Sequence, residues 1–191
     1  MSLKQKKFNI KIPHNTDLIY SSEKKTLTVV GPLTTKSMKL KLRITINENK
    51  KILSVSPIPF FHASNAEKKR MDALRATTAA QIKHLLIESS TTIFQKLKII
   101  GVGYRIDFAD EAIKNLLTFK LGYSHFFYVK VPKDLQLNCF TKTKFSIFGN
   151  SYHEICQLAA KIRDKKIPEP YKGKGILYEN ETVTLKEGKK I

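Results

Sequence analysis

The residues best suited to bind a ligand lie together near the C-terminus, in segment 168–178. The segment reads Pro-Glu-Pro-Tyr-Lys-Gly-Lys-Gly-Ile-Leu-Tyr, and its two prolines fix φ and exclude a helix. Glycine lets a backbone approach a surface closely, lysine supplies positive charge, and tyrosine supplies a flat ring with a hydroxyl. This combination favours a phosphate-rich partner over a catalytic pocket. The alternative is a flexible basic loop that binds nothing.

The net charge helps to decide between these interpretations. The chain carries 35 Lys and Arg against 16 Asp and Glu, which gives a formal net charge of +19 and a pI near 9.9. Such an excess indicates a polyanionic partner, with nucleic acid the first candidate and an anionic membrane the second. The longest unbroken apolar run, 126–129, has four residues, whereas a membrane span needs about 20. We therefore expect nucleic acid as the partner and no membrane.

Patterns for catalysis, cofactors and metals are incomplete. The glycines of 101–103 begin like a dinucleotide-binding fingerprint, but Ile106 stands where the third glycine belongs. Segment 173–175 lacks the spaced upstream glycine and the Lys-Ser/Thr ending of a phosphate-binding P-loop. The histidines are scattered and the cysteines far apart, so we expect no enzyme, no cofactor and no metal. The alternative to a binding protein is a small enzyme that uses Cys139 or Cys156.

The elements that must position segment 168–178 are predicted from hydrophobic periodicity. A Ser-x-x-Glu capping box at Ser64 predicts a helix over 65–89, and a second box at Ser151 opens a helix that ends before Pro168. Strands are predicted at 8–13, 17–20, 26–30, 38–46, 51–55, 95–100, 104–108, 114–121, 127–131, 135–138, 144–148, 175–178 and 182–186.

The two halves of the chain repeat each other. Segment 8–13 matches 127–132 at a constant offset, and 27–31 matches 145–149 when one gap is allowed. In each half the strands lead to a helix opened by a capping box. This pattern predicts that one small α+β unit has been duplicated. We expect an α+β fold of two similar domains, each a small, mainly antiparallel sheet packed with one helix.

Three segments of the second half resemble the signatures of a known family. They read Gly-Val-Gly-Tyr-Arg at 101–105, Leu-Gly-Tyr-Ser-His at 121–125 and Pro-Glu-Pro-Tyr-Lys-Gly-Lys-Gly at 168–175. In order and spacing they resemble ribosomal protein L6 (uL6) of the bacterial and organellar type. The resemblance implies a structural, non-catalytic protein of the large ribosomal subunit. Over the first half it is weaker: Pro-Leu-Thr-Thr at 32–35 stands where the family usually has Pro-Lys-Gly.

The resemblance also implies partners, domains and site residues. The expected domains are 1–90 and 91–191, the second of which would bind ribosomal RNA near the factor-binding region and the sarcin–ricin loop. Neighbouring ribosomal proteins and nearby translation factors are the other implied partners. The resemblance implies that ribosomal RNA is contacted by Tyr171, Lys172, Gly173, Lys174 and Gly175, with Ser124 and His125 from a second matching motif.

Two further expectations concern where the protein acts. Its heavy use of Lys, Ile and Asn resembles the product of an AT-rich genome, and no import signal is visible at the N-terminus. Together with the divergence from the family, this favours a mitochondrial ribosome and an organelle-encoded protein, with bacterial cytoplasm or a plastid as the alternatives. The alternative function is a free-standing RNA-binding module outside the ribosome.

Overall fold

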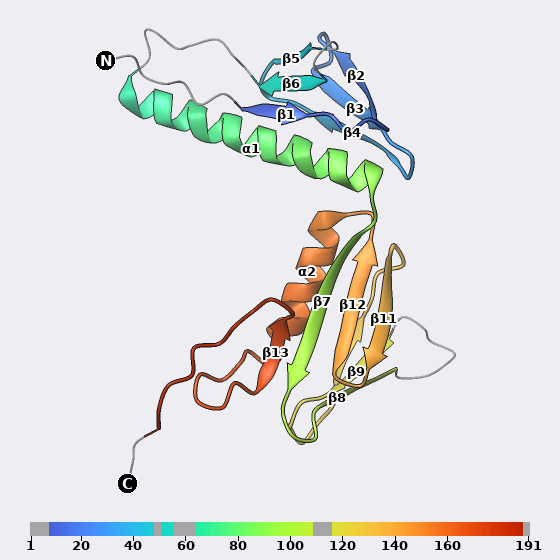
Figure 1. Cartoon of the computed structure of the whole chain (residues 1–191), viewed down its shortest axis with the longest axis vertical. Helices are drawn as coiled ribbons and strands as arrows, with labels where there is room; N and C mark the ends of the chain where they lie inside the picture. The colour runs from blue at the N-terminus through green and yellow to red at the C-terminus, as the bar shows by residue number, and fades with distance from the viewer. Residues whose placement is uncertain (1–7, 48–50, 56–63, 109–115, 189–191) are drawn as a thin grey trace. The chain divides into compact units, whose positions relative to one another are not determined.

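The protein has an α+β fold, and this confirms the predicted fold class (Figure 1). The computed structural model describes residues 8–47, 51–55, 64–108 and 116–188. Its contacts divide the chain into two compact units, residues 1–92 and 93–191. Within the described residues, each unit contains one helix and two small antiparallel sheets.

Unit 1 packs its helix on two three-stranded sheets. The sheets have the orders β2-β3-β4 and β1-β6-β5. Their strands are β1 (Asn9–Lys11), β2 (Asp17–Ser21), β3 (Thr26–Val30), β4 (Thr35–Lys39), β5 (Ile44–Asn47) and β6 (Ile52–Val55). Helix α1 (Asn65–Ser90) buries only residues from Arg75 onward, so its first half extends past the strands (Figure 1). The fully buried Leu27 and Leu53 join both sheets to Ile82 of the helix in one core.

The predicted single strand 38–46 is wrong, because the chain bends at Leu40–Arg43 and enters the other sheet. Met38 ends up in β4 and Ile44 in β5, although both face inward. Leu40 is buried at the bend, and its amide donates to the carbonyl of Lys25 at 2.7 Å. The apolar alternation runs on through the bend, and strands that switch sheets turn at such corners.

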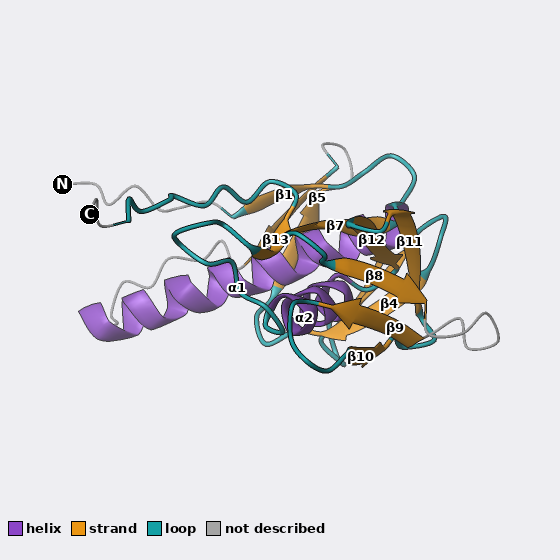
Figure 2. Ribbon diagram, turned by 90° about the horizontal axis from the view of Figure 1, so that it is seen from below, coloured by secondary structure: helices purple, strands orange, loops and turns teal. Residues whose placement is uncertain are grey.

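Unit 2 also packs one helix against its sheets. Its sheets have the orders β10-β9-β8 and β11-β12-β7-β13, and the first is seen strand by strand in Figure 2. The strands are β7 (Ile93–Ile100), β8 (Arg105–Phe108), β9 (Leu116–Lys120), β10 (Phe127–Lys130), β11 (Leu135–Thr141), β12 (Lys144–Gly149) and β13 (Gly175–Tyr178). Helix α2 (Tyr152–Arg163) packs on β7, β12 and β13. The rings of Phe119 and Phe145 meet edge to face in the core, with centroids 6.0 Å apart.

The same strand pairings occur in both units, in a different chain order. The sheet β1-β6-β5 corresponds to β10-β9-β8, and β2-β3-β4 corresponds to β11-β12-β7. In unit 1 the chain runs directly from β3 into β4, with Val30 opposite Thr35. In unit 2 the equivalent pair is Phe148 of β12 opposite Phe94 of β7, which comes first in the chain. The three strands that follow β3 in unit 1 therefore correspond to strands that precede β10 in unit 2, which is a cyclic permutation of the strand order, whereas the helix follows the sixth strand in both units.

Two more predictions, the second capping box and the last strand, are wrong. At α1 the capping box is confirmed: the Ser64 hydroxyl accepts from the Glu67 amide, and the Ser64 amide donates to the Glu67 carboxylate. Ser151 makes no side-chain cap bond, so the capping box predicted there is wrong; its φ and ψ are −121° and 113°, against −61° and 161° at Ser64. The predicted strand 182–186 is irregular chain, and β13 pairs with β7 instead. Neither helix of the described residues is apolar over a length that would cross a membrane.

Candidate nucleic-acid interface

The three signature segments meet at one end of unit 2. They form the loop between β7 and β8, the loop between β9 and β10, and the loop between α2 and β13. The Tyr104 ring packs against glycines of the first two. A Cβ atom on Gly122, which has φ +76°, would lie 2.8 Å from Cε1 of Tyr104, and one on Gly101 would lie 2.5 Å from Cδ2. These glycines leave the room that the tyrosine ring occupies.

The three loops surround a groove of about 490 Å³. We call it the signature groove. Aromatic, basic and acidic side chains line it: Tyr104, Tyr123, Asp164, Lys165, Lys166, Ile167, Glu169 and Lys174. Each of the three signatures contributes to this lining, and residues 164–167, which directly follow α2, supply the rest. The groove can therefore offer rings for stacking, cations for phosphates and carboxylates for hydrogen-bond donors.

An aromatic cluster of Tyr123, His125 and Phe127 includes one ring that lines the groove, that of Tyr123. The Tyr123 and His125 rings stack at 28° with centroids 5.9 Å apart, and Phe127 meets their edges at 5.2 and 4.7 Å. The Nζ atom of Lys166 lies 4.2 Å from the Tyr123 ring centroid, and that of Lys165 lies 5.8 Å from the Phe127 centroid. Cation–π contacts of this kind hold the lysines against the rings.

Electrostatics in the groove favours the charged form of Lys166. A hydrogen bond with the Tyr123 side chain is the main cause that raises the pKa of Lys166 above its ordinary value. Burial, the next cause in size, lowers this pKa, and electrostatic interactions with Tyr104, Tyr123 and Glu169 raise it by smaller amounts. Lys166 is therefore protonated at neutral pH and supplies a positive charge beside the Tyr123 ring.

The loop 168–175 is shaped by its two glycines. Gly173 is buried, and its amide donates to the Glu169 carbonyl at 2.9 Å, while the Glu169 amide donates to the Lys174 carbonyl at 3.0 Å. Gly175 is buried too, with φ +152°, and a Cβ atom there would lie 2.6 Å from Cα of Pro168. The positive φ angles, +66° at Gly173 and +152° at Gly175, explain why glycine suits both positions of the turn.

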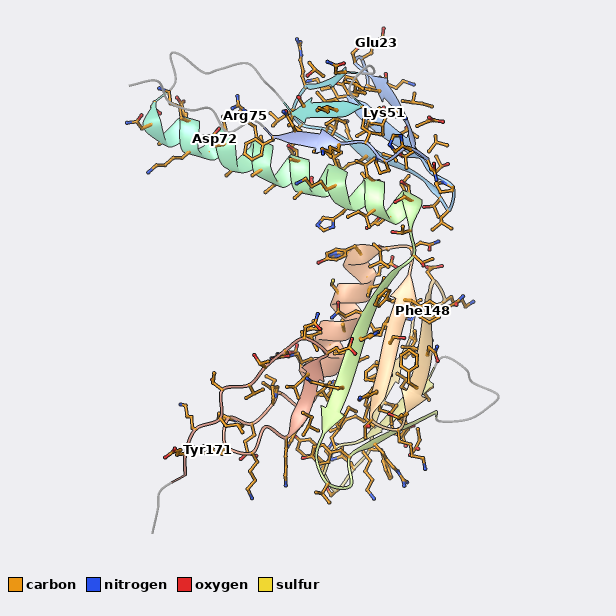
Figure 3. All side chains as sticks on the ribbon, viewed as in Figure 1. Glu23, Lys51, Asp72, Arg75, Phe148 and Tyr171 are labelled. Atoms are coloured by element: carbon orange, nitrogen blue, oxygen red, sulfur yellow. The ribbon has the colours of Figure 1, made fainter. Side chains whose placement is uncertain are left out.

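The polar members of the same loop face outward. Tyr171 is 55% exposed and points away from the sheets (Figure 3), and Lys172 is exposed beside it. Lys174 is half-buried and lines the signature groove. In the neighbouring loop Ser124 and His125 are exposed, and only His125 belongs to the aromatic cluster.

The segment that follows β13 supports the loop. Arg163 of α2 forms a two-pronged ion pair with Glu181, at 3.0 and 2.5 Å, and the Tyr178 amide also donates to that carboxylate at 3.2 Å. The hydrogen bond from Arg163 is the main cause that lowers the pKa of Glu181. Further along, the Lys186 amide donates to the Pro170 carbonyl at 2.9 Å. Residues 179–188 thus tie the loop to the helix.

Sequence reasoning missed several residues of the groove. Tyr104 and Tyr123 lie inside the recognised signatures but were not predicted as site residues. Lys165 and Lys166 lie directly before the third signature, and their basic pair was the available signal. Tertiary packing alone brings these four side chains together, because 61 residues of chain separate Tyr104 from Lys165.

The two cysteines, proposed as nucleophiles in the alternative enzyme, lie apart from the groove lining. Cys139 and Cys156 form no disulfide, and burial raises the pKa of the Cys139 thiol, which opposes formation of the nucleophilic thiolate. Cys156 contacts Tyr152, whose pKa is raised mainly by that hydrogen bond. Across the part of the chain that the structure describes, no three His, Cys, Asp or Glu side chains gather as metal ligands.

Comparison with known proteins identifies the family. A family model described as Ribosomal protein L6 matches residues 100–179, the region of the three signatures. The large ribosomal subunit protein uL6 of Mycoplasmoides gallisepticum is 35% identical over 185 residues, which cover 94% of this chain and 92% of the relative. That of Bordetella avium is 33% identical over 184 residues (96% and 97%), and that of Chlorobium limicola 34% over 161 residues (84% and 84%). The chain therefore belongs to the ribosomal protein L6 (uL6) family.

Proposed function

We propose that this protein is a structural constituent of the large ribosomal subunit and binds large-subunit rRNA through the end of unit 2. The observation that carries the proposal is the convergence of three signature loops on one basic and aromatic groove. A net charge of +19 supplies the attraction to a polyanion. The rRNA contacts proposed are Tyr171, Lys172, Gly173, Lys174 and Gly175, together with Ser124 and His125.

The proposed mechanism is passive. Lysines at the loop 168–175 neutralise phosphates and release counterions, while the buried glycines hold the backbone in the shape that presents them. Exposed Tyr171 offers a ring and a hydroxyl to a sugar or an unstacked base. Gly173 and Gly175 then act through the backbone and not through direct side-chain contact. Such binding fixes an rRNA fold without any covalent step.

We further propose the place of the protein in the particle. Residues 1–90 form an N-terminal repeat, and residues 91–191 form the repeat that carries the rRNA-binding loop. The rRNA lies near the factor-binding region and the sarcin–ricin loop, with translation factors nearby and other large-subunit proteins as neighbours. The family membership supports the large subunit and its rRNA as the general partners.

The ribosome that we propose is bacterial in type. Composition had favoured a mitochondrial, organelle-encoded protein, but the relatives described above come from bacteria and give that expectation no support. Of the alternatives, the bacterial cytoplasm fits these relatives and the plastid stays a prediction. The compartment is tested by detecting the chain in organelle and cytosol fractions of the source cells.

The test of the main proposal is sucrose-gradient fractionation of a lysate followed by detection of this chain. We expect it to migrate with large subunits and to stay there through a high-salt wash, as an integral ribosomal protein does. A peak at the top of the gradient, separate from the subunits, would favour the free-standing RNA-binding module.

A further inference from the structure

We infer that the signature groove binds one unstacked guanosine of the RNA. The inference rests on the proposed function, since it names the nucleotide that this same site takes. It adds Tyr104, Tyr123, Lys166, Asp164 and Glu169 to the interface, and the contacts proposed above include none of them.

The groove offers rings on which a base can stack. Tyr123 is 42% exposed, and Lys166 Nζ covers its ring at 4.2 Å. The neighbouring Tyr104 ring is held in place by the glycines against which it packs. A base can take the position of the ammonium on the Tyr123 ring, because lysine has a long flexible stem and its charge can move to a phosphate. Unstacked RNA bases are bound on aromatic side chains in this way.

The size and the cations of the groove match a single nucleotide. Its volume of about 490 Å³ lies within the range of roughly 300–1,000 Å³ that is common for small-ligand sites. Lys165, Lys166 and Lys174 border it and can reach the phosphates on either side of the base. A duplex does not enter such a space, so the base must come from a loop, a bulge or an end.

The two carboxylates select the base. Asp164 and Glu169 would repel a phosphate, so a groove that bound only the RNA backbone would gain nothing from them. A carboxylate accepts hydrogen bonds from base edges. Guanine presents two adjacent N–H donors, N1–H and N2–H, to a carboxylate, whereas adenine, cytosine and uracil each place an acceptor next to their donor. The acidic lining therefore favours guanine over the other three bases.

The first experiment uses the full chain with Tyr123→Trp. The protein has no tryptophan, so this residue is the only tryptophan fluorophore and lies in the groove. We expect the tetranucleotide UUGU to quench its fluorescence and to bind about tenfold more tightly than UUUU, the effect of one well-formed bidentate base contact. Asp164→Asn combined with Glu169→Gln should abolish the difference. Equal binding of the two tetranucleotides, or no quenching, would overturn the inference.

A matched control is Tyr128→Trp. Tyr128 is a 61% exposed tyrosine on β10 that does not line the signature groove. We expect no guanosine-dependent quenching at this position. A response equal to that at position 123 would mean general association with RNA and would contradict a specific pocket.

A second experiment separates this inference from the proposed function. In binding to large-subunit rRNA, Tyr123→Leu should weaken affinity about tenfold, the effect of removing one stacking ring, and should leave the salt slope unchanged because no charge is removed. Tyr123→Phe should restore the affinity. Lys172→Ala, outside the groove, should flatten the slope instead. If Lys172→Ala flattens the salt slope but Tyr123→Leu leaves the rRNA affinity unchanged, the guanosine pocket is overturned and the proposed function is kept. If neither substitution changes rRNA binding, both the pocket and the proposed function are refuted.

Discussion

Units 1 and 2 share the pairings of six strands, and the signature groove lies in unit 2. The correspondence reaches single hydrogen bonds: the Leu40 amide donates to Lys25 at 2.7 Å, and the Ile99 amide donates to Thr143 at 2.8 Å, each to the turn of the adjacent hairpin. The difference lies in the connections. Where unit 2 has the signature loop 121–126, unit 1 has the separate ends of β6 and β1, with the Val55 amide donating to the Phe8 carbonyl at 3.3 Å.

This comparison teaches that the signature groove is formed by the connections between the strands and not by the sheets that both units share. In the strand order of unit 2, a loop that carries Tyr123 joins β9 to β10. The corner 40–43 of unit 1 keeps Leu40 buried, whereas the equivalent turn of unit 2 carries Gly101, which makes room for the Tyr104 ring. The added strand β13 brings the third loop to the same end. Substitutions in the loops should therefore distinguish the two units.

The largest effect is expected for Gly122→Ala. Gly122 has φ +76° and a Cβ atom would meet the Tyr104 ring, whereas Gly103 has φ +75° and open space around it. Backbone strain costs about 1–3 kcal/mol at either position, and Gly122→Ala must in addition displace the ring. We expect Gly122→Ala to lower the free energy of unfolding more than Gly103→Ala in urea denaturation. Equal losses would show that the Tyr104 packing is dispensable.

The next effect concerns the lysines proposed to bind phosphates. Lys172→Ala with Lys174→Ala should weaken binding to large-subunit rRNA and flatten the log–log salt slope by about 0.7–0.9 for each phosphate that is no longer neutralised. The control with the same change of charge is Lys41→Ala with Arg43→Ala, at the exposed corner of unit 1. Its slope should change less, as measured by filter binding between low and moderate salt. If both pairs flatten the slope equally, the two units share the interface.

A smaller effect on stability is expected at the N-caps of the two helices. Ser64→Ala removes the hydroxyl of a formed capping box and should cost about 1 kcal/mol of stability. Ser151→Ala removes a hydroxyl that makes no cap bond, and the loss of stability should stay within about 0.5 kcal/mol. Thermal or urea unfolding of the two variants measures the difference. Equal losses of stability in the two variants would contradict the difference between the N-caps Ser64 and Ser151.

The smallest effect is a pH dependence of unit 2. The pKa of the Glu181 carboxyl lies below its ordinary value of 4.5, mainly because of the hydrogen bond from Arg163. A depressed folded-state pKa means that the ion pair stabilises the fold above pH 4.5 and that this contribution is lost as pH falls through the folded-state pKa. Glu181→Gln should cost less than about 1 kcal/mol at pH 7. The difference in the free energy of unfolding between Glu181→Gln and the parent should vanish in acid. A difference that stays constant with pH would contradict a contribution from the ionised Glu181 carboxylate.

Much of the fold could be predicted from the sequence because its signals are local. The helix 65–89 and the strands around it follow from periodicity and one capping box. The break at Leu40 could not be predicted, because alternation continues through a bend. In the groove the signature loops were recognisable one by one. Their meeting around Tyr104 and Lys166 depends on contacts between distant segments, which periodicity does not encode.

The ties between residues 179–188 and the rest of unit 2 matter for handling the protein. Arg163 holds this segment at Glu181, and Pro170 accepts from Lys186. A chain trimmed after Tyr178 by a protease would keep β13 yet lose both anchors of the loop that presents Lys172. Purification tags and fluorescent labels therefore belong at the other end of the chain, and a preparation should be checked by mass for C-terminal clipping before weak RNA binding is attributed to a substitution.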